Sequence, residues 1–374
     1  MSELKTVAVC ATPFLPETAS WLYHQISGLR RYRPVVLTQE VRNSAQFPVP
    51  VLHSAEELRP PMKWLNRLLR GVLRELPLYA GIMGREGADL IHAHFGHHAC
   101  RCLRARRASG LPMITSFYGA DATQYALIPH WQQRYRRLFR EGELFLAEGS
   151  AMAAQLVRIG CPPDKVRIHH LGVALDEIPF REREPTNRVR VLICASFREK
   201  KGIPLGLRAL GRALAGLDLD CRVTLIGDGP ERAQVMSAVS SAGLEGRVDW
   251  RGPLHYSQVL AEMAECQLLL QPSLTASDGD SEGGAPVILL DAQAAGIPVV
   301  STLHADIPEY VLDGESGLLT AEGDEEALVE SLRSLLTEQG RWGEMGRRGR
   351  RHVEEHYDAA RQCRSMEEIY DAVS

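Results

Sequence analysis

The sequence has no apolar run long enough to cross a membrane. A membrane-spanning helix needs about twenty predominantly apolar residues, and none of the apolar stretches in these 374 residues reaches that length. The segment MSELKTVAVCATPF enters an apolar strand directly and lacks the layout of a signal peptide. We therefore expect a cytoplasmic protein without a transmembrane helix.

Three further absences exclude other classes of site. Cys100 and Cys102 form a C-x-C pair without a second pair, so we expect no zinc site and eight reduced thiols. No G-x-G-x-x-G follows the first predicted strand, which argues against a dehydrogenase. Aromatic residues make up only 6% of the chain and it shows no nucleic-acid motif, so no nucleic-acid partner is expected.

Charge is divided unevenly along the chain. The formal net charge is -4, yet residues 1–180 carry a net positive charge and the remainder a net negative one. The basic residues of the first part form clusters, at 30–33, 63–74, 101–107 and 134–140. Each cluster is either a solvated helix face or a surface for an anionic membrane.

Short apolar segments alternate with amphipathic ones along the whole chain. The predicted strands are 7–11, 35–38, 49–52, 90–95, 113–116, 144–147, 166–170, 189–195, 223–226, 248–251, 268–271, 299–302 and 317–319. Predicted helices include 19–31, 63–83, 152–159, 204–215 and 230–242. This alternation predicts an α/β protein built on parallel sheets with helices on both faces.

The polar segment 180–189, FREREPTNRV, interrupts the pattern and is typical of a linker. It predicts two Rossmann-like doubly wound domains, 1–180 and 181–357, and the charged tail 325–374 is predicted to be helical throughout. Because such sheets bind ligands beyond the carboxyl ends of their strands, the cleft between the two domains is the expected active site.

An acidic, glycine-rich stretch from Ser277 to Leu319 carries the strongest functional signal, SDGDSEGGAPVILLDAQAAGIPVVSTLHADIPEYVLDGESGLL. Glu282 can accept hydrogen bonds from sugar hydroxyls, and Asp291 can accept them from a ribose diol. The loop residues Gly283, Gly284, Ala285 and Pro286 are predicted to bind the donor, and the backbone amides of the first three can face a diphosphate or a sugar. A glutamate that only caps the helix 286–295 would explain neither the two glycines nor the second acid.

This stretch resembles the donor-site signature of retaining nucleotide-sugar glycosyltransferases of family 4, and is most similar to bacterial exopolysaccharide and lipopolysaccharide enzymes. The resemblance implies the GT-B fold, with a helix at 358–374 that crosses back to the first domain. It also implies retaining transfer of a hexose from a UDP or GDP sugar, without a metal or other cofactor. The family places seven residues between two glutamates, whereas here eight residues separate Glu282 from Asp291.

The segment ASFREKKG follows the first strand of the second domain. Lys201 matches a family lysine that binds the donor diphosphate and stabilises its charge as it leaves. Ser196 stands where the family has an arginine, and Arg198, two residues on and on the same face, is predicted to replace it. A solvated basic turn is the alternative.

Two further turns of the second domain match the family. Gly227, Asp228 and Gly229 form a turn that lets backbone amides approach a ligand, although similar turns also serve only to change direction. Pro253 and Leu254 stand where similar enzymes hold the nucleobase through backbone groups.

In the first domain, Glu17 and Thr18 end a PFLPET loop that resembles the family's P-x-x-S-E-T loop and is predicted to face the acceptor. Glu17 is equally well explained as an acid at a helix start. His94 ends a strand in the motif HAHFG, and we expect a substrate contact rather than zinc there.

The motif FYGAD aligns with a family F-H-G-x-D loop in which the histidine contacts the transferred sugar. Tyr118 occupies the histidine position, and Asp121 completes the motif. A phenol can donate and accept a hydrogen bond but cannot carry a positive charge. Because of Ser196 and Tyr118, a nucleotide-sugar-binding protein with weakened catalysis is an alternative, as is a natural-product or small-molecule glycosyltransferase.

The acceptor is expected to be a saccharide or a lipid-linked saccharide. Cations at positions 63, 67, 70 and 74 share one face of a predicted helix, and leucines lie on the other. Such a helix can lie on an anionic membrane surface, which predicts peripheral contact at the inner membrane face. Alternatively, its leucine face packs against the sheet and the cations lie in water.

Overall fold

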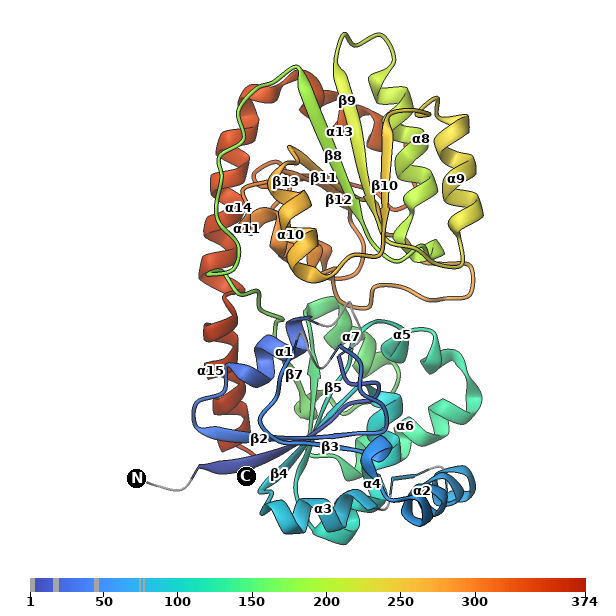
Figure 1. Ribbon diagram of the computed structural model, residues 1–374, viewed down its shortest axis with the longest axis vertical. Coiled ribbons are helices and arrows are strands. Elements are labelled where there is room, and N and C mark those ends of the chain that lie inside the picture. The colour runs from blue at the N-terminus through green and yellow to red at the C-terminus, as the bar shows by residue number, and fades with distance from the viewer. Residues whose placement is uncertain (1–3, 16–19, 44–46, 74, 77) are drawn as a thin grey trace. The chain divides into compact units, whose positions relative to one another are not determined.

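The computed structural model describes residues 4–15, 20–43, 47–73, 75, 76 and 78–374 (Figure 1). The chain divides into two compact units. Unit 1 comprises Met1–Gly172 and Ala359–Ser374, and unit 2 comprises Val173–Asp358. Because the first segment ends at Gly172, the predicted boundary at residue 180 lies eight residues too late.

Unit 1 holds a seven-stranded sheet in the order β3-β2-β1-β4-β5-β6-β7, and every pair of neighbouring strands is parallel. The strands are β1 (Lys5–Cys10), β2 (Tyr32–Thr38), β3 (Leu52–Ser54), β4 (Leu90–His94), β5 (Met113–Ser116), β6 (Leu144–Ala147) and β7 (Val166–Ile168). Its helices are α1 (Ser20–Ser27), α2 (Pro60–Leu73), α3 (Leu78–Glu86), α4 (Gly96–Ser109), α5 (Gly119–Ala122), α6 (Pro129–Glu141), α7 (Ser150–Arg158) and α15 (Ala359–Asp371).

Unit 2 holds a six-stranded parallel sheet in the order β10-β9-β8-β11-β12-β13. The strands are β8 (Arg188–Cys194), β9 (Asp220–Ile226), β10 (Val248–Gly252), β11 (Leu268–Gln271), β12 (Val299–Thr302) and β13 (Gly317–Thr320). The helices are α8 (Ile203–Leu214), α9 (Arg232–Ser241), α10 (Tyr256–Ala264), α11 (Ile288–Ala294), α12 (Ile307–Tyr310), α13 (Glu325–Thr337) and α14 (Trp342–His356). Both units therefore have the predicted doubly wound α/β architecture.

Burial on both faces of the unit 1 sheet explains why β1 has apolar residues at consecutive positions. Along β1, Val7 and Val9 belong to one buried cluster, whereas Ala8 and Cys10 belong to another. Successive side chains of a strand point to opposite faces, so helices must cover each side of the sheet. Apolar residues at consecutive positions are the expected signature of such strands.

The predicted linker at 180–189 is wrong, because this polar segment is fixed to unit 2. Arg183 is only 4% exposed, and its Nε donates to the carbonyl of Cys266 at 2.7 Å. The amide of Arg181 donates to Ala295 O at 3.2 Å. Long-range backbone acceptors thus satisfy the polar groups that made the segment resemble a free connection.

One predicted helix is divided in the structure. The predicted helix 63–83 becomes α2 and α3, and between them the amide of Leu76 donates to the carbonyl of Arg101 at 2.9 Å. The sequence has Pro77 at this point, and a proline interrupts helical hydrogen bonding. The tail 325–374 is helical as predicted, and forms α13, α14 and α15.

The last of these helices, α15, packs against α1 in unit 1 and is held there by a buried carboxylate (Figure 1). Glu367 is 2% exposed, and its Oε1 accepts hydrogen bonds from the amides of Arg30 and Arg31, both at 2.6 Å. The Arg31 Nε donates to its Oε2 at 3.2 Å. The Glu367 side chain therefore accepts hydrogen bonds from the two backbone amides just before β2.

Replacing this carboxylate should destabilise the protein. Glu367→Ala leaves two partly buried amides without an acceptor, which costs about 1–3 kcal/mol of the free energy of unfolding. Urea unfolding of the variant measures the loss. Glu368→Ala removes the neighbouring exposed carboxylate and should change the free energy by less than about 0.5 kcal/mol. Equal losses in the two variants would contradict the anchoring role of Glu367.

Candidate functional site

The predicted donor residues of unit 2 follow the carboxyl ends of its parallel strands. Lys201 lies in the turn after β8, and Glu282 lies in the long loop after β11. These two strands are neighbours in the sheet, although β9 and β10 separate them in the sequence. Strand order reverses between them, and ligands of doubly wound sheets bind at such a reversal.

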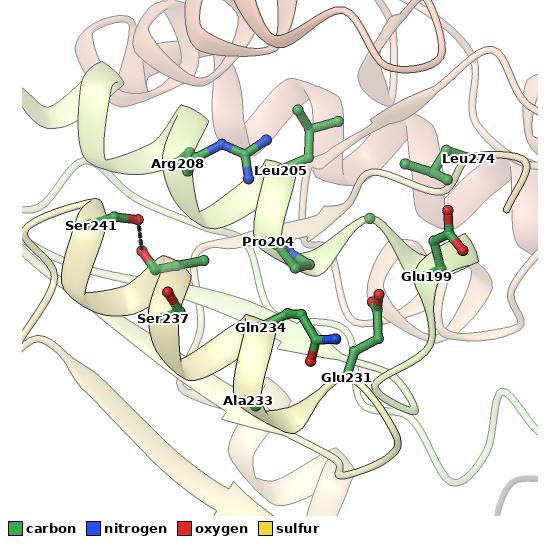
Figure 2. A pocket seen from close by; sticks show the side chains of 12 residues that line it. Glu199, Pro204, Leu205, Arg208, Glu231, Ala233, Gln234, Ser237, Ser241 and Leu274 are labelled. Carbon is green, nitrogen blue, oxygen red and sulfur yellow. Dashed lines mark hydrogen bonds between the residues drawn. The ribbon is translucent and has the colours of Figure 1, made fainter. Parts of the chain in front are cut away.

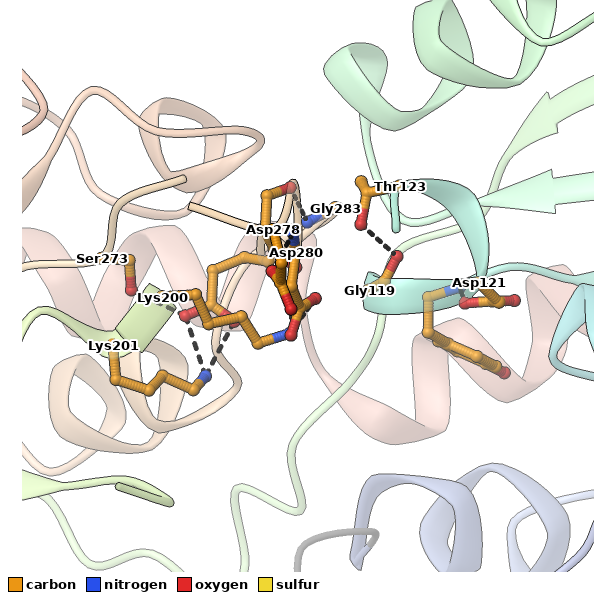
Figure 3. Close-up of polar contacts among 12 residues, drawn as sticks. Gly119, Asp121, Thr123, Lys200, Lys201, Ser273, Asp278, Asp280 and Gly283 are labelled. Atoms are coloured by element: carbon orange, nitrogen blue, oxygen red, sulfur yellow. Dashed lines mark hydrogen bonds and ion pairs between the residues drawn. The ribbon is translucent and has the colours of Figure 1, made fainter. Parts of the chain in front are cut away.

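A buried ion pair joins these two loops (Figure 3). The Lys201 Nζ lies 2.8 Å from Oε1 and 2.7 Å from Oε2 of Glu282, and the side chains are 14% and 6% exposed. The Ser273 hydroxyl donates to Glu282 Oε1 at 2.7 Å. Burial alone would raise the pKa of Glu282, but the Lys201 and Lys200 cations outweigh it and lower this pKa. The carboxylate is therefore ionised at neutral pH.

A second ion pair lies in the same two segments. The Lys200 Nζ is 3.0 Å from Asp280 Oδ1 and donates to the carbonyl of Ser281 at 2.9 Å. Both lysines of the basic turn are thus neutralised by the acidic loop. Arg198 is exposed and has no carboxylate within ion-pair distance among the residues that the structure describes. Ser196 precedes it and is half-buried.

His304 and Glu322 support the loop from the opposite side, and the sequence analysis assigned neither of them a role. The amide of Glu282 donates to His304 Nε2 at 3.2 Å, and His304 Nδ1 lies 2.6 Å from Glu322 Oε2. Because Nε2 accepts, the ring proton is on Nδ1 and the imidazole is neutral. His304 belongs to the HADIPE segment of the predicted donor-site signature. That motif is the sequence feature that could have identified His304.

The glycine pair of the loop is buried rather than open. Gly283 has a φ of 73°, which favours glycine, and its amide donates to the Ser281 hydroxyl at 3.1 Å. The carbonyl of Gly284 accepts from the amide of Asp306 at 3.1 Å. Ala285 and Pro286 are buried too. The loop is therefore held by its own contacts, and contact of its amides with a ligand stays a prediction.

Asp291 lies inside α11 and is only 3% exposed. The Tyr256 hydroxyl donates to its Oδ1 at 3.0 Å. Burial raises the pKa of Asp291 to about 7, and the charge of Glu177 adds to the effect. One of the two oxygens predicted to bind a ribose diol is thus occupied by Tyr256.

The turn after β9 needs its glycines for packing against the turn after β8. A Cβ on Gly227 would lie 1.9 Å from the carbonyl oxygen of Ala195, and one on Gly229 would lie 2.6 Å from that of Phe197. The amide of Gly227 donates to Gly252 O at 2.9 Å. The amide of Gly229 donates to the carboxylate of Asp228 at 2.8 Å, so both amides are already paired. Pro253 and Leu254 follow β10 at the same edge of the sheet.

In unit 1, His94 and Tyr118 contact each other. His94 Nδ1 lies 2.7 Å from the Tyr118 hydroxyl, and the two side chains are 1% and 5% exposed. Burial lowers the pKa of His94 to about 3, so its ring is neutral. His92 is bound by Ser116 and Tyr370, both at 2.8 Å. The predicted substrate contacts of His94 and Tyr118 therefore stay predictions about residues that are buried in this structure.

Asp121 has a structural role in unit 1. Its Oδ1 accepts from the amide of Tyr118 at 3.0 Å, and its Oδ2 accepts from the amide of Gly96 at 2.7 Å. It is 2% exposed, and its two hydrogen bonds join the loop after β5 to the start of α4. Its predicted place on the acceptor side is not tested by these contacts. Glu17 and Thr18 lie outside the described residues.

A hollow of about 610 Å³ lies between α8 and α9 of unit 2 (Figure 2). Its polar lining includes Glu199, Arg208 and Glu231. Glu199 accepts hydrogen bonds from the amide and hydroxyl of Ser277, at 2.9 and 2.7 Å. The residues that line this hollow include none of the predicted donor residues in the described part of the chain. No three His, Cys, Asp or Glu side chains gather for a metal in that part either.

The raised pKa of Asp291 predicts a pH-dependent stability. The value of about 7 exceeds the ordinary 3.8, so folding takes up a proton between these limits. The contribution of Asp291 is complete below about pH 4 and is lost as the pH rises through about 7. Asp291→Asn should be more stable than wild type at pH 8, by up to about 4 kcal/mol. This advantage should vanish near pH 4.

Thermal unfolding across this pH range measures the difference. Asp218→Asn is the matched control, because it makes the same substitution at an exposed position. A constant difference between Asp291→Asn and wild type would contradict the buried, protonated aspartic acid.

Comparison with known proteins identifies relatives of both units. Residues 175–352 match the family described as Glycosyl transferases group 1, and residues 22–177 match Glycosyltransferase Family 4. The chain is 34% identical over 248 residues to a putative colanic acid biosynthesis glycosyltransferase, WcaL, of Salmonella typhimurium. It is 33% identical over 251 residues to the amylovoran biosynthesis glycosyltransferase AmsK of Erwinia amylovora. Each alignment covers 66% of this chain and 61% of the relative, so the chain spans less than two thirds of these relatives' length.

Solved structures show the same fold. The crystal structure of HepE from Anabaena in complex with UDP-glucose superposes with a TM-score of 0.79 at 17% identity, covering 98% of this chain and 99% of that one. WaaG, a glycosyltransferase involved in lipopolysaccharide biosynthesis, superposes with a TM-score of 0.69 at 16% identity, covering 98% and 99%. A glycosyltransferase family therefore matches each half of the chain, group 1 at residues 175–352 and family 4 at residues 22–177, and the chain has the GT-B fold.

Proposed function

We propose that the protein transfers a hexose from a UDP or GDP sugar to an acceptor hydroxyl, with retention of the anomeric configuration. The observation that carries this proposal is the buried Lys201–Glu282 pair at the reversal of strand order in unit 2. It places a cation and a carboxylate where a nucleotide sugar would bind in a doubly wound sheet. The UDP and UDP-glucose complexes of HepE, a protein of the same fold, support this type of donor.

The two members of the pair have different roles in this proposal. Glu282 accepts hydrogen bonds from sugar hydroxyls, and its pairing with Lys201 and Ser273 holds both oxygens in place. Lys201 has three N–H donors, two of which contact Glu282, so one remains for a phosphate oxygen. As the bond from the anomeric carbon to the diphosphate breaks, that donor stabilises the developing charge.

Arg198 supplies the second cation. Lys200 and Lys201 are paired with acids, whereas the Arg198 side chain is exposed at the same turn. A guanidinium can bind two phosphate oxygens at once, and it stays charged at every physiological pH. The proposal therefore gives Arg198 the diphosphate contact that the family's arginine would make from position 196.

No metal is needed in this mechanism, because cationic side chains bind the leaving group. The new bond forms between the acceptor oxygen and the anomeric carbon on the face that the diphosphate leaves. The acceptor's proton passes to a phosphate oxygen of the departing nucleoside diphosphate. Atoms and charges balance without a protein nucleophile.

The relatives suggest the pathway in which this reaction takes place. WcaL is a putative colanic acid biosynthesis glycosyltransferase and AmsK is an amylovoran biosynthesis glycosyltransferase. We therefore propose a role in cell-surface polysaccharide assembly, with a saccharide or lipid-linked saccharide as acceptor. The enzyme would act in the cytoplasm, at the inner face of the membrane.

The exposed face of α2 supports contact with that membrane. Trp64 is 68% exposed, Leu68 46% and Leu65 36%, so these side chains are not packed against the sheet. Asn66 is buried instead and donates to Gln39 Oε1 at 2.8 Å. Apolar side chains next to cations are typical of helices that lie in a membrane interface. No described helix is long and apolar enough to span a membrane.

Glu282→Gln tests the sugar contact. The amide keeps one acceptor oxygen for Lys201 but removes the charge, so turnover should fall about 10²–10³-fold. Binding of UDP should change less than about threefold, measured by isothermal titration calorimetry beside the hydrolysis or transfer of the donor sugar. Asp280→Asn is the control, because it breaks the Lys200 pair in the same loop without touching Glu282. Parallel losses of turnover and UDP binding would make Glu282 a nucleotide-binding residue.

Flotation with liposomes tests the membrane contact. Each cation near an anionic surface contributes about 1 kcal/mol, so wild type should float with anionic vesicles at low salt and separate at high salt. Trp64→Ala with Leu68→Ala should reduce flotation, whereas Leu127→Ala, at another exposed apolar residue, should not. Failure of wild type to float with anionic vesicles would favour a soluble acceptor.

A further inference from the structure

A basic pocket of about 480 Å³ lies in unit 1, whereas the residues assigned to the donor belong to unit 2. Helices α2, α4 and α6 contribute to its lining, which consists of Arg67, Arg70, Gly71, Arg101, His130, Trp131 and Arg134. Four arginines from three helices thus converge on one hollow. This convergence could not be read from the sequence, where the same residues belong to three separate clusters.

None of the four arginines has a carboxylate within ion-pair distance among the described residues. Other arginines on α4 and α6 do have such partners: Arg107 and Arg137 pair with Glu75 and Glu141 at distances of 2.8–3.8 Å. The helices are therefore able to pair their cations with acids. The four arginines of the pocket instead line one hollow without such partners among the described residues.

The polar and aromatic neighbours of the pocket hold the arginines without neutralising them. The Arg70 Nη1 lies 3.5 Å from Gln39 Oε1, and the guanidinium of Arg134 lies 5.4 Å from the centre of the Trp131 ring. Trp131 in turn stacks on Tyr125, with ring centres 5.9 Å apart and planes 10° from parallel. Cation–π contact orients a guanidinium but leaves its charge in place.

Concentrating like charges in a partly buried space costs free energy. Arg101 and Arg134 are half-buried, and the pKa of Arg101 is lowered by burial and by the charges of Arg134 and Arg70. Arginine does not lose its proton under physiological conditions, so only an anion can relieve the repulsion. A phosphate group offers several oxygens and accepts bidentate hydrogen bonds from guanidinium groups.

We propose that the pocket formed by Arg67, Arg70, Arg101 and Arg134 binds a phosphate or diphosphate group carried by the acceptor. The proposal rests on the proposed glycosyl transfer and narrows its acceptor to a phosphate-bearing saccharide, either soluble or linked to a lipid. The guanidinium groups donate to the phosphate oxygens, and Trp131 forms a rigid wall beside them.

Titration calorimetry with inorganic pyrophosphate tests the pocket. Saturating UDP is present throughout so that the donor site does not bind the probe. Arg101→Gln with Arg134→Gln should weaken pyrophosphate binding at least tenfold. Arg107→Gln with Arg137→Gln removes the same charge from the same two helices outside the pocket, and should change binding less than twofold. Arg67→Gln with Arg70→Gln, on exposed positions of α2, provides a second variant that does not depend on folding of the half-buried pair.

Pyrophosphate binding that is equal in wild type and both pocket variants would overturn the proposal, as would equal weakening in the control variant. The affinities for UDP and GDP are measured separately on each variant; a wild-type protein that binds neither nucleotide would instead contradict the proposed donor. Vesicles of phosphatidylcholine with and without a phosphate-bearing anionic lipid distinguish the source of the group. The vesicle comparison uses Arg101→Gln with Arg134→Gln, because these side chains lie outside α2, the helix proposed to contact the membrane. If this variant loses both pyrophosphate and anionic-vesicle binding, the group belongs to a lipid. If it loses only pyrophosphate binding, the group belongs to a soluble acceptor.

Discussion

Parallel pairing of every strand is the constraint on which the rest of this structure depends. Two parallel neighbours cannot be joined by a tight hairpin. Each connection must therefore return to the opposite end of the sheet before the next strand begins, usually through a helix. The helices cover both faces, and the loops that follow the strands collect at one edge. In unit 2 this brings the turn after β8 beside the loop after β11, at the reversal of strand order. Lys201 and Glu282 meet there although 81 positions separate them.

The two units differ in whether their cationic side chains are paired with acids, in addition to the difference in their net charges. In unit 2 the acidic loop forms ion pairs with both Lys200 and Lys201, and these pairs offset the desolvation cost of burying the charges. In unit 1, by contrast, Arg101 and Arg134 share a pocket without an acid among their described neighbours. The donor residues are thus already ordered by one another, whereas the arginine pocket has charge that is not balanced within the described chain.

Backbone architecture was predictable from this sequence because burial on both faces leaves a continuous apolar signature. Strands β5, β6, β11 and β12 have the predicted bounds for this reason. The segment around Arg183 has the polar composition of a linker but is fixed to unit 2, since its polar groups find acceptors at residues far along the chain, such as Cys266. Long-range side-chain contacts leave no local pattern. The support of Glu282 by Ser273 and His304, and the occupation of Asp291 by Tyr256, therefore needed three-dimensional coordinates.

The division of the chain also determines the order in which the protein can fold on the ribosome. Unit 1 includes α15, which is synthesised after the whole of unit 2. Until it emerges, the amides of Arg30 and Arg31 lack Glu367, and His92 lacks the hydroxyl of Tyr370. Domains usually fold in the order in which they are made. Here the unit that begins the chain is completed last, and the unit in the middle can reach its final structure first.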